Sequence, residues 1–217
     1  MLNRLKMHFT NFLQKDNDIA LQKRKRFLTF ETLQAMAQAY DDKTKEPPLL
    51  PATIETMRWA YEQICTGEDP WTALGNFTNA WYGYAKHLRA DLVHEPLLHP
   101  EQETEYTHQW AAFCAASVEF LCDRYRIPCP DWVNASSYTL ETPWWRTSQP
   151  QNPSMRERLL QMTPAPFARR NIFCSNRLFQ NKYEIYEWVQ EAIEKGITTP
   201  GEIHRYARQK EISIYGA

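Results

Sequence analysis

Apolar side chains recur at three- and four-residue steps along much of this chain, which is the spacing of one face of an α-helix. The clearest stripe consists of Leu74, Phe77, Trp81, Tyr84, Leu88 and Leu92. Stripes of this kind predict helices over residues 29–40, 54–65, 70–94, 100–121 and 185–193. The apolar positions within residues 1–28 also fit an amphipathic helix, and only residues 171–175 have the composition of a strand.

Helix-start and helix-stop signals agree with these stripes. Asp69 followed by Pro70 is typical of a helix start. The carboxylate accepts hydrogen bonds from the unpaired N–H groups of the first turn, and proline has no N–H to leave unpaired. Pro100 predicts another start, with acidic residues in the first turn, where the helix dipole favours them. Gly67 is expected to end the helix before it. Further starts are predicted at Ser154-x-x-Glu157, at Asn181 with Glu184, and at Thr199-Pro200-Gly201-Glu202.

These patterns predict an all-α fold: an irregular multi-helix bundle with a long loop rich in proline and tryptophan and a C-terminal helical hairpin. The expected parts are a basic N-terminal arm or helix (1–28), a helical core (29–126), the Pro/Trp-rich loop (127–153) and a C-terminal helical subdomain packed on the core (154–217). The hairpin resembles the opening of a helix-turn-helix unit. Too few residues follow it to form a recognition helix, which favours local geometry over the reading of DNA.

The Pro/Trp-rich loop is the first candidate for a binding function. A loop of this length in a compact protein is unusual and is often functional. We expect its tryptophans to dock it onto the helices, and the adjacent Trp144 and Trp145 cannot easily share one environment. Together with Arg146 they have the composition of an interface hot spot, so we assign partner binding to these three residues. The alternative is that both indoles only seal the helical core.

A net charge of −1 conceals a strong segregation of charge along the chain. Residues 1–28 carry a net charge of +5, residues 29–154 carry −9 and residues 155–217 carry +3. Such a pattern allows either internal pairing of the oppositely charged parts or recruitment of a charged partner.

Nucleic-acid binding is the alternative function that this segregation raises. Basic residues beside aromatic ones suit contacts to a phosphate backbone. The residues assigned to such contacts are Lys23, Arg24, Lys25, Arg26, Arg169, Arg170 and Arg177. Against this alternative, the pI is about 6.6 and the acidic middle would repel a polyanion. Salt bridges between the basic ends and the acidic middle would explain the same pattern.

Catalysis finds little support in the sequence. Cys114 and Cys122 lie in an apolar stripe, as small core residues do, and Cys174 follows two arginines that would lower its pKa if they lay close to it. Asp91 with His94 and Glu105 with His108 have a spacing seen in metal sites, but helix ends explain both pairs. We therefore predict no metal and no cofactor, and the six scattered glycines form no phosphate-binding loop.

The function predicted from these observations is that of a non-catalytic interaction protein, a regulator or subunit of a macromolecular complex. A protein is the expected partner and nucleic acid the alternative. No stretch is apolar over the roughly 20 residues of a membrane span, so no membrane role is expected. The first fifteen residues lack the apolar core of a signal peptide, and five cysteines cannot all pair, so we expect reduced thiols in the cytoplasm.

Overall fold

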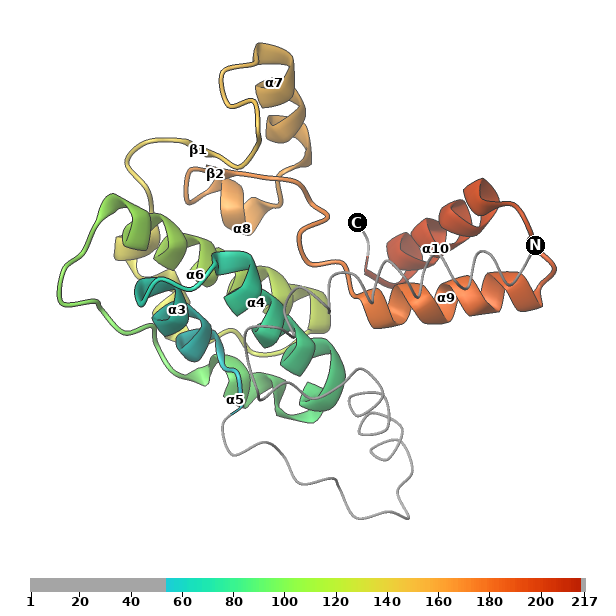
Figure 1. Ribbon diagram of the computed structural model, residues 1–217, viewed down its shortest axis with the longest axis horizontal. Coiled ribbons are helices and arrows are strands. Elements are labelled where there is room, and N and C mark those ends of the chain that lie inside the picture. Colours follow the sequence, from blue (N-terminus) through green and yellow to red (C-terminus); the bar gives the residue numbers. More distant parts are fainter. Residues whose placement is uncertain (1–53, 216–217) are drawn as a thin grey trace. The chain divides into compact units, whose positions relative to one another are not determined.

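The computed structural model describes residues 54–215, which belong to one compact unit spanning residues 50–217. Helices dominate these residues, and the two short strands contain two residues each (Figure 1). The all-α prediction is therefore confirmed for the described part of the chain. The helices predicted for residues 1–28 and 29–40, and the boundary between them, lie outside it.

Helices α3 (Met57–Cys65) and α4 (Pro70–Asn79) lie within the helices predicted over residues 54–65 and 70–94, and α3 ends and α4 begins at the predicted residues. Asp69 accepts a hydrogen bond from the Thr72 amide at 2.9 Å, as expected of the residue that caps α4. Gly67 has a φ of +95°, a left-handed conformation that suits glycine, and it lies two residues beyond the end of α3. The two helices pack against each other, and α3 also packs on α6.

The helix predicted over residues 70–94 ends at the expected place but is not continuous. After α4 come a π-helical turn, η1 (Ala80–Tyr84), a 3-10 turn, η2 (Lys86–Leu88), and the short helix α5 (Arg89–His94). The prediction of one regular helix was wrong: a π turn whose five residues are all buried interrupts it. Such turns occur mostly as single-turn insertions in α-helices, and the spacing of apolar residues in the sequence does not distinguish them from a continuous α-helix.

Helix α6 (Glu105–Tyr125) is the longest helix of the described residues and is buried along most of its length. It starts later than predicted, so Glu101 and Glu103 precede it and do not form its first turn. The reason is a reciprocal cap: Thr104 accepts from the Thr107 amide at 3.1 Å, and the Thr107 hydroxyl accepts from the Thr104 amide at 2.9 Å.

The Pro/Trp-rich loop contains short regular pieces: the 3-10 turns η3 (Asp131–Asn134) and η4 (Ser136–Tyr138), and strand β1 (Trp144–Trp145). Strand β1 pairs in parallel with β2 (Ile172–Phe173). The strand predicted within residues 171–175 is thus confirmed, whereas its partner in the loop was not foreseen. The indole Nε1 of Trp132 donates to the Val93 carbonyl at 3.0 Å, so a tryptophan docks the loop on the helices as expected.

Two short helices, α7 (Pro153–Met162) and α8 (Ala165–Ala168), separate the two strands in sequence. The start predicted at Ser154 is shifted by two residues, because Asn152 accepts hydrogen bonds from the Ser154 and Met155 amides. Proline fits the first position of α7 because the N–H group that it lacks would have no hydrogen-bond partner within the helix.

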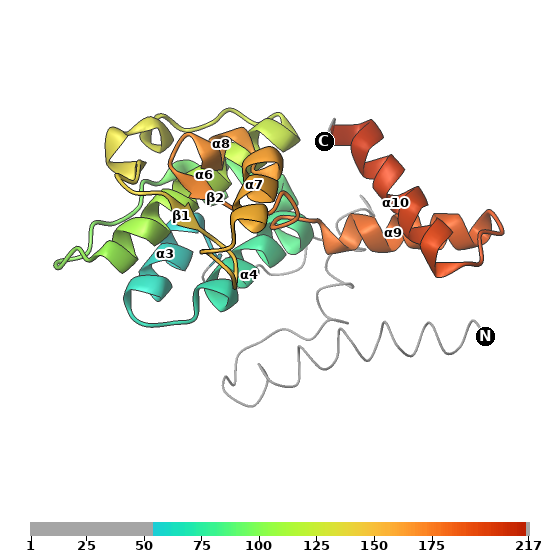
Figure 2. The same cartoon turned by 90° about the horizontal axis from the view of Figure 1, so that it is seen from above.

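Helices α9 (Lys182–Glu194) and α10 (Pro200–Tyr215) form the predicted C-terminal hairpin. Figure 2 shows α10 turning back across α9 after the connection that contains Gly196, whose φ is +79°. Both predicted caps are present: Asn181 accepts from the Tyr183 and Glu184 amides, and the Thr199 hydroxyl accepts from the Glu202 amide.

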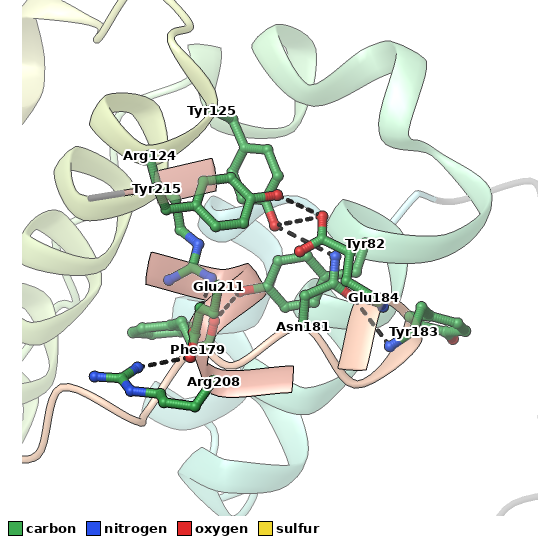
Figure 3. Close-up of polar contacts among 10 residues, drawn as sticks. All are labelled: Tyr82, Arg124, Tyr125, Phe179, Asn181, Tyr183, Glu184, Arg208, Glu211 and Tyr215. Carbon is green, nitrogen blue, oxygen red and sulfur yellow. Dashed lines mark hydrogen bonds and ion pairs between the residues drawn. The ribbon is translucent and has the colours of Figure 1, made fainter. Parts of the chain in front are cut away.

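A polar network links the hairpin to α6 (Figure 3). The Glu211 carboxylate accepts from Arg124 at 3.0 Å and from Arg208 at 2.6 Å, and the Arg124 and Glu211 side chains are only 8% and 5% exposed. Beside it, Glu184 accepts from the hydroxyl of Tyr215 at 2.6 Å. The contacts between α10 and α6 therefore include a buried ion pair as well as apolar packing.

Candidate interaction surface

Aromatic side chains from α4, α6 and β1 meet around Trp110. Its ring lies 5.7 Å from that of Trp71 and 5.2 Å from that of Trp144, in both cases edge to face. Phe113 lies beneath all three, with ring centroids 5.2–6.1 Å away. Edge-to-face packing is a favoured geometry for aromatic pairs, so three elements remote in sequence share one aromatic cluster.

Arg146 lies against this cluster with its charged group over three indole rings. The distances from its guanidinium carbon to the ring centroids are 4.6 Å for Trp144, 4.9 Å for Trp110 and 5.3 Å for Trp71. All three fall within the range of cation–π attraction. Burial lowers the pKa of Arg146, while the nearby Cys174 and Tyr106 oppose that change.

The guanidinium of Arg146 has no acidic partner among the described residues. No hydrogen bond or ion pair joins it to any of them, and its Nε atom is buried without an acceptor. Arg124 and Arg170, whose side chains are largely buried, both bind carboxylates. Arg146 therefore keeps donors that a ligand from outside could use.

Trp145 lies in a different environment from Trp144, as the sequence indicates for two adjacent indoles. Its ring stacks on Phe173 with centroids 4.3 Å apart, and Arg156 lies over it at 5.1 Å. Arg156 is itself held by the Pro150 carbonyl, to which its Nε donates at 2.6 Å. Trp145 thus joins β1, β2 and α7.

Two exposed aromatic side chains adjoin the cluster. Trp71 is 43% exposed and Tyr106 is 48% exposed, and the Tyr106 ring lies 6.4 Å from that of Trp110. With the half-buried Trp144 and Arg146, they form what we call the aromatic–arginine surface: Trp71, Tyr106, Trp144 and Arg146. The sequence singled out two of these four residues and also Trp145, which lies half-buried beside them. It gave no signal for Trp71 and Tyr106 as part of a site, because these residues, in the first turns of α4 and α6, join the cluster only through the tertiary fold.

Arg170 does not have the surface role assigned to it with the phosphate-binding residues. It is 4% exposed, and its guanidinium donates to Glu119 at 2.6 Å and to the carbonyls of Pro166 and Val133 at 2.7 and 2.8 Å. These bonds fasten α8 and the Pro/Trp-rich loop to α6. The correction has a simple physical reason: the acidic middle of the chain supplies a buried carboxylate that Arg170 neutralises.

The other two described residues assigned to nucleic acid, Arg169 and Arg177, are exposed, unlike Arg170. Arg169 is exposed and forms an ion pair with Glu119 on α6. Arg177 is exposed beyond β2. The cluster of residues 23–26 lies outside the described residues, so the basic surface proposed from the sequence rests chiefly on that part of the chain.

The buried thiols do not have the properties of nucleophiles. Burial raises the pKa of Cys174 to about 12, and Arg146 opposes this only in part. Burial also raises the pKa of Cys122 to about 12 and raises that of Cys114. The prediction that neighbouring arginines could lower the pKa of Cys174 is thus wrong. All three thiols are protonated at neutral pH and fill the core.

The two carboxylate–histidine pairs are separate and do not form a common site. The His108 Nε2 atom lies 2.7 Å from the Ser137 carbonyl oxygen, and Glu105 accepts from Gln109 at 3.0 Å. Asp91 and His94 are exposed on α5. Among residues 54–215, no three His, Cys, Asp or Glu side chains are grouped so that they could hold a metal ion.

Comparison with known proteins gives no relative: no family model matches this chain, and neither do the curated proteins or the solved structures. Within the described residues, no helix combines the length and the apolarity needed to cross a membrane.

Proposed function

We propose that this protein is a non-catalytic interaction protein that binds a protein partner through the aromatic–arginine surface, as a regulator or subunit of a macromolecular complex. The observation that carries the proposal is the position of Arg146 over three indole rings, with none of the acidic groups of residues 54–215 bound to it. Tryptophan, tyrosine and arginine are the residues that most often dominate the binding energy of protein interfaces.

Exposure supports the same proposal. Trp71 and Tyr106 leave close to half of their surface in contact with solvent, although both adjoin a well-packed aromatic cluster. A rigid aromatic group on a firm support loses little conformational entropy on binding, which favours affinity. The alternative, that the cluster only closes the core, accounts for Phe113 and Trp110 but not for the exposed rings beside them.

The cytoplasm is the compartment we propose. Cys114, Cys122 and Cys174 are buried, and none of the five cysteines forms a disulfide. Reduced thiols in a core are typical of proteins that work in a reducing compartment.

Nucleic acid stays the alternative partner, and the structure changes which residues would serve it. Arg170 is committed to the core, so Arg169, Arg177 and residues 23–26 would carry the phosphate contacts. A partner held by such contacts would be lost after nuclease treatment or at raised salt.

The test is affinity purification from native, nuclease-treated lysate with quantitative mass spectrometry, comparing the wild type with two pairs of variants. Trp71→Ala has Tyr186→Ala as its control, since the two rings are 43% and 44% exposed. Arg146→Gln has Arg205→Gln, a change of an exposed arginine on α10. Thermal unfolding shows that each variant folds.

We expect the same set of proteins to be recovered with the wild type and both controls, and to be depleted about tenfold or more with Trp71→Ala and Arg146→Gln, as is usual for hot-spot residues. Recovery that is equal across all five proteins would show that the aromatic–arginine surface is not the binding site. A signal that disappears with nuclease alone would favour the nucleic-acid alternative.

A further inference from the structure

The unsatisfied donors of Arg146 point to the chemistry of the partner. A guanidinium carries five N–H groups in one plane, and the three indole rings over which that of Arg146 lies are not conventional hydrogen-bond acceptors. None of the described residues accepts a hydrogen bond from these N–H groups, and the Nε atom is buried without a partner. Every other buried or half-buried arginine that the structure describes donates to an acceptor; examples are Arg124 to Glu211, Arg170 to Glu119 and Arg89 to the Trp81 carbonyl.

We infer that the aromatic–arginine surface binds an acidic side chain, Asp or Glu, from an internal segment of the protein partner, with Arg146 as the group that holds its carboxylate. This inference rests on the proposed function, whose partner it specifies. A planar carboxylate matches the edge of a guanidinium and forms two parallel N–H···O bonds with it. Partial withdrawal of Arg146 from water, which lowers its pKa, strengthens such a bond.

A single carboxylate suits the site better than a phosphate backbone does. Tight binding of a polyanion needs several cations that contact successive phosphates. Here Arg156, which lies over the Trp145 ring, is already engaged, because it donates to Pro150 and Gln151. Close to Tyr106, the chain carries Glu101, Glu103 and Glu105, which would repel a polyanion.

The carboxylate is expected to come from a side chain rather than from a chain terminus. Recognition of a terminal carboxylate commonly uses a set of unpaired backbone N–H groups. The amides beside Arg146 are already committed: Trp144 donates to Asn171, Arg146 to Phe173 and Thr147 to Trp145, at 2.8–3.0 Å. The side chain of Arg146 therefore supplies the donors.

The exposed rings predict what flanks the acidic residue. Trp71 and Tyr106 both contact Trp110, one of the indoles beneath the guanidinium. Apolar or aromatic side chains next to the carboxylate in the partner would cover these rings and exclude water from the ion pair. That exclusion is what gives an interfacial ion pair a large share of the binding energy.

Peptide display tests the inference without knowledge of the natural partner. A random peptide library displayed within a carrier protein, so that no peptide has a terminal carboxylate, is selected on the wild type, on Arg146→Gln and on Arg205→Gln. We expect the wild type and Arg205→Gln to enrich sequences that hold Asp or Glu beside aromatic or aliphatic residues. Arg146→Gln should lose this enrichment.

The most enriched sequence is then synthesised with an amidated C-terminus and titrated calorimetrically against the folded proteins. We expect replacing its acidic residue with the amide to weaken binding to the wild type about tenfold or more, and to change little with Arg146→Gln, because the two groups are coupled. Arg146→Lys keeps the positive charge but loses the planar set of N–H donors that matches a carboxylate, so it should bind with intermediate affinity. If Arg146→Gln does not fold, the peptide change on the wild type and Arg146→Lys still give the answer.

Three outcomes would overturn the inference: enrichment of neutral or basic peptides, equal binding of the acidic and amide peptides, or tighter binding when phosphoserine replaces the acidic residue. The failure of the inference differs from that of the proposed function. If only the inference fails, cellular proteins are still lost with Trp71→Ala, but the selected peptides show no preference for acidic residues. If the proposed function fails, the set of proteins recovered by affinity purification does not depend on Trp71 or Arg146.

Discussion

Arg170 and its neighbour Arg169 both pair with Glu119, yet they lie in opposite environments. Arg170 is buried and bonded to one carboxylate and two carbonyls, whereas the Arg169 side chain is 56% exposed. Nothing in the local sequence distinguishes the two residues. The difference arises because the chain just after α8 directs Arg170 toward α6, and it decides how much each residue contributes to stability.

Substitution of these neighbours should therefore have very different effects. We expect Arg170→Ala to lower the free energy of unfolding by about 3–5 kcal/mol, since it leaves the Glu119 carboxylate and two carbonyls buried without their donor. Arg169→Ala should lower it by no more than about 1 kcal/mol. Urea denaturation followed by circular dichroism measures both. Similar losses for the two variants would show that Arg170 does not fasten the loop.

The buried thiols provide a second prediction at this scale. Because burial raises the pKa of Cys122 and Cys174 to about 12, both stay protonated at pH 8. Thiolate is the reactive form, so their alkylation in the native protein should be more than about a hundredfold slower than in urea. Timed reaction with iodoacetamide and peptide mass mapping measures each site. Rapid labelling of Cys174 in the folded protein would contradict its assignment to the core.

Local sequence signals predict where the helices lie far better than they predict which side chains the helices bring together. Asp69, Asn181 and Thr199 act through neighbours two or three residues away, so their roles as caps could be predicted. The π turn at Ala80–Tyr84 could not, because the apolar spacing over residues 70–94 fits a continuous α-helix and no local signal marks the interruption. The same limit applies to the candidate site. Trp144 and Arg146 belong to one short segment whose composition marks it as a candidate interface, so the sequence could single them out. Trp71 and Tyr106 reach the site only through the packing of α4 and α6.

The C-terminal hairpin should respond to acid through Glu211. Burial alone would raise the pKa of this carboxyl, but hydrogen bonds from Arg124 and Arg208 outweigh it and lower the pKa below its ordinary value. A lowered folded-state pKa contributes stability above the unfolded-state pKa, and this stability is lost as pH falls through the folded-state value. The contacts of α10 with α6 should therefore weaken below a pH of about 4.

Hydrogen exchange measures this loosening segment by segment. After correction for the intrinsic effect of pH, we expect protection of α10 to fall on acidification in the wild type. In Glu211→Gln, protection should be low already at neutral pH and should change less with acid. Glu191→Gln is the control, because Glu191 pairs with Lys195 and Lys210 within the exposed part of the hairpin. Protection of α10 that ignores both pH and Glu211→Gln would contradict this role of the ion pair.

Over the whole molecule, the segregated charges pair with each other where the structure describes them. Arg169 and Arg170 from the basic C-terminal part bind Glu119 of the acidic middle, and Arg124 of the middle binds Glu211 of the C-terminal part. Internal pairing, one of the two explanations that the sequence left open, thus accounts for these residues. The pattern of charge along a chain shows which parts can pair, but only the fold shows which of them do.

Internal pairing leads to a prediction about nucleic acid. If Arg169 serves the fold, Arg169→Gln and Arg177→Gln should leave the binding of labelled single-stranded DNA or RNA unchanged at about 50 mM salt, a concentration at which backbone contacts are strong. Fluorescence anisotropy with the full chain measures this. A clear loss of affinity with either variant, together with a steep salt dependence, would favour nucleic-acid binding over the function proposed above.

The central claim, that the aromatic–arginine surface contacts a protein partner, is tested most directly by a photocrosslinker placed on it. Trp71→p-benzoylphenylalanine puts the probe at an exposed ring of the surface, and Tyr186→p-benzoylphenylalanine puts it at an equally exposed ring on α9. After irradiation in cells, we expect a discrete protein adduct from position 71 that disappears when Arg146→Gln is added, and no such adduct from position 186. No adduct from position 71, or the same adducts from both positions, would contradict the claim.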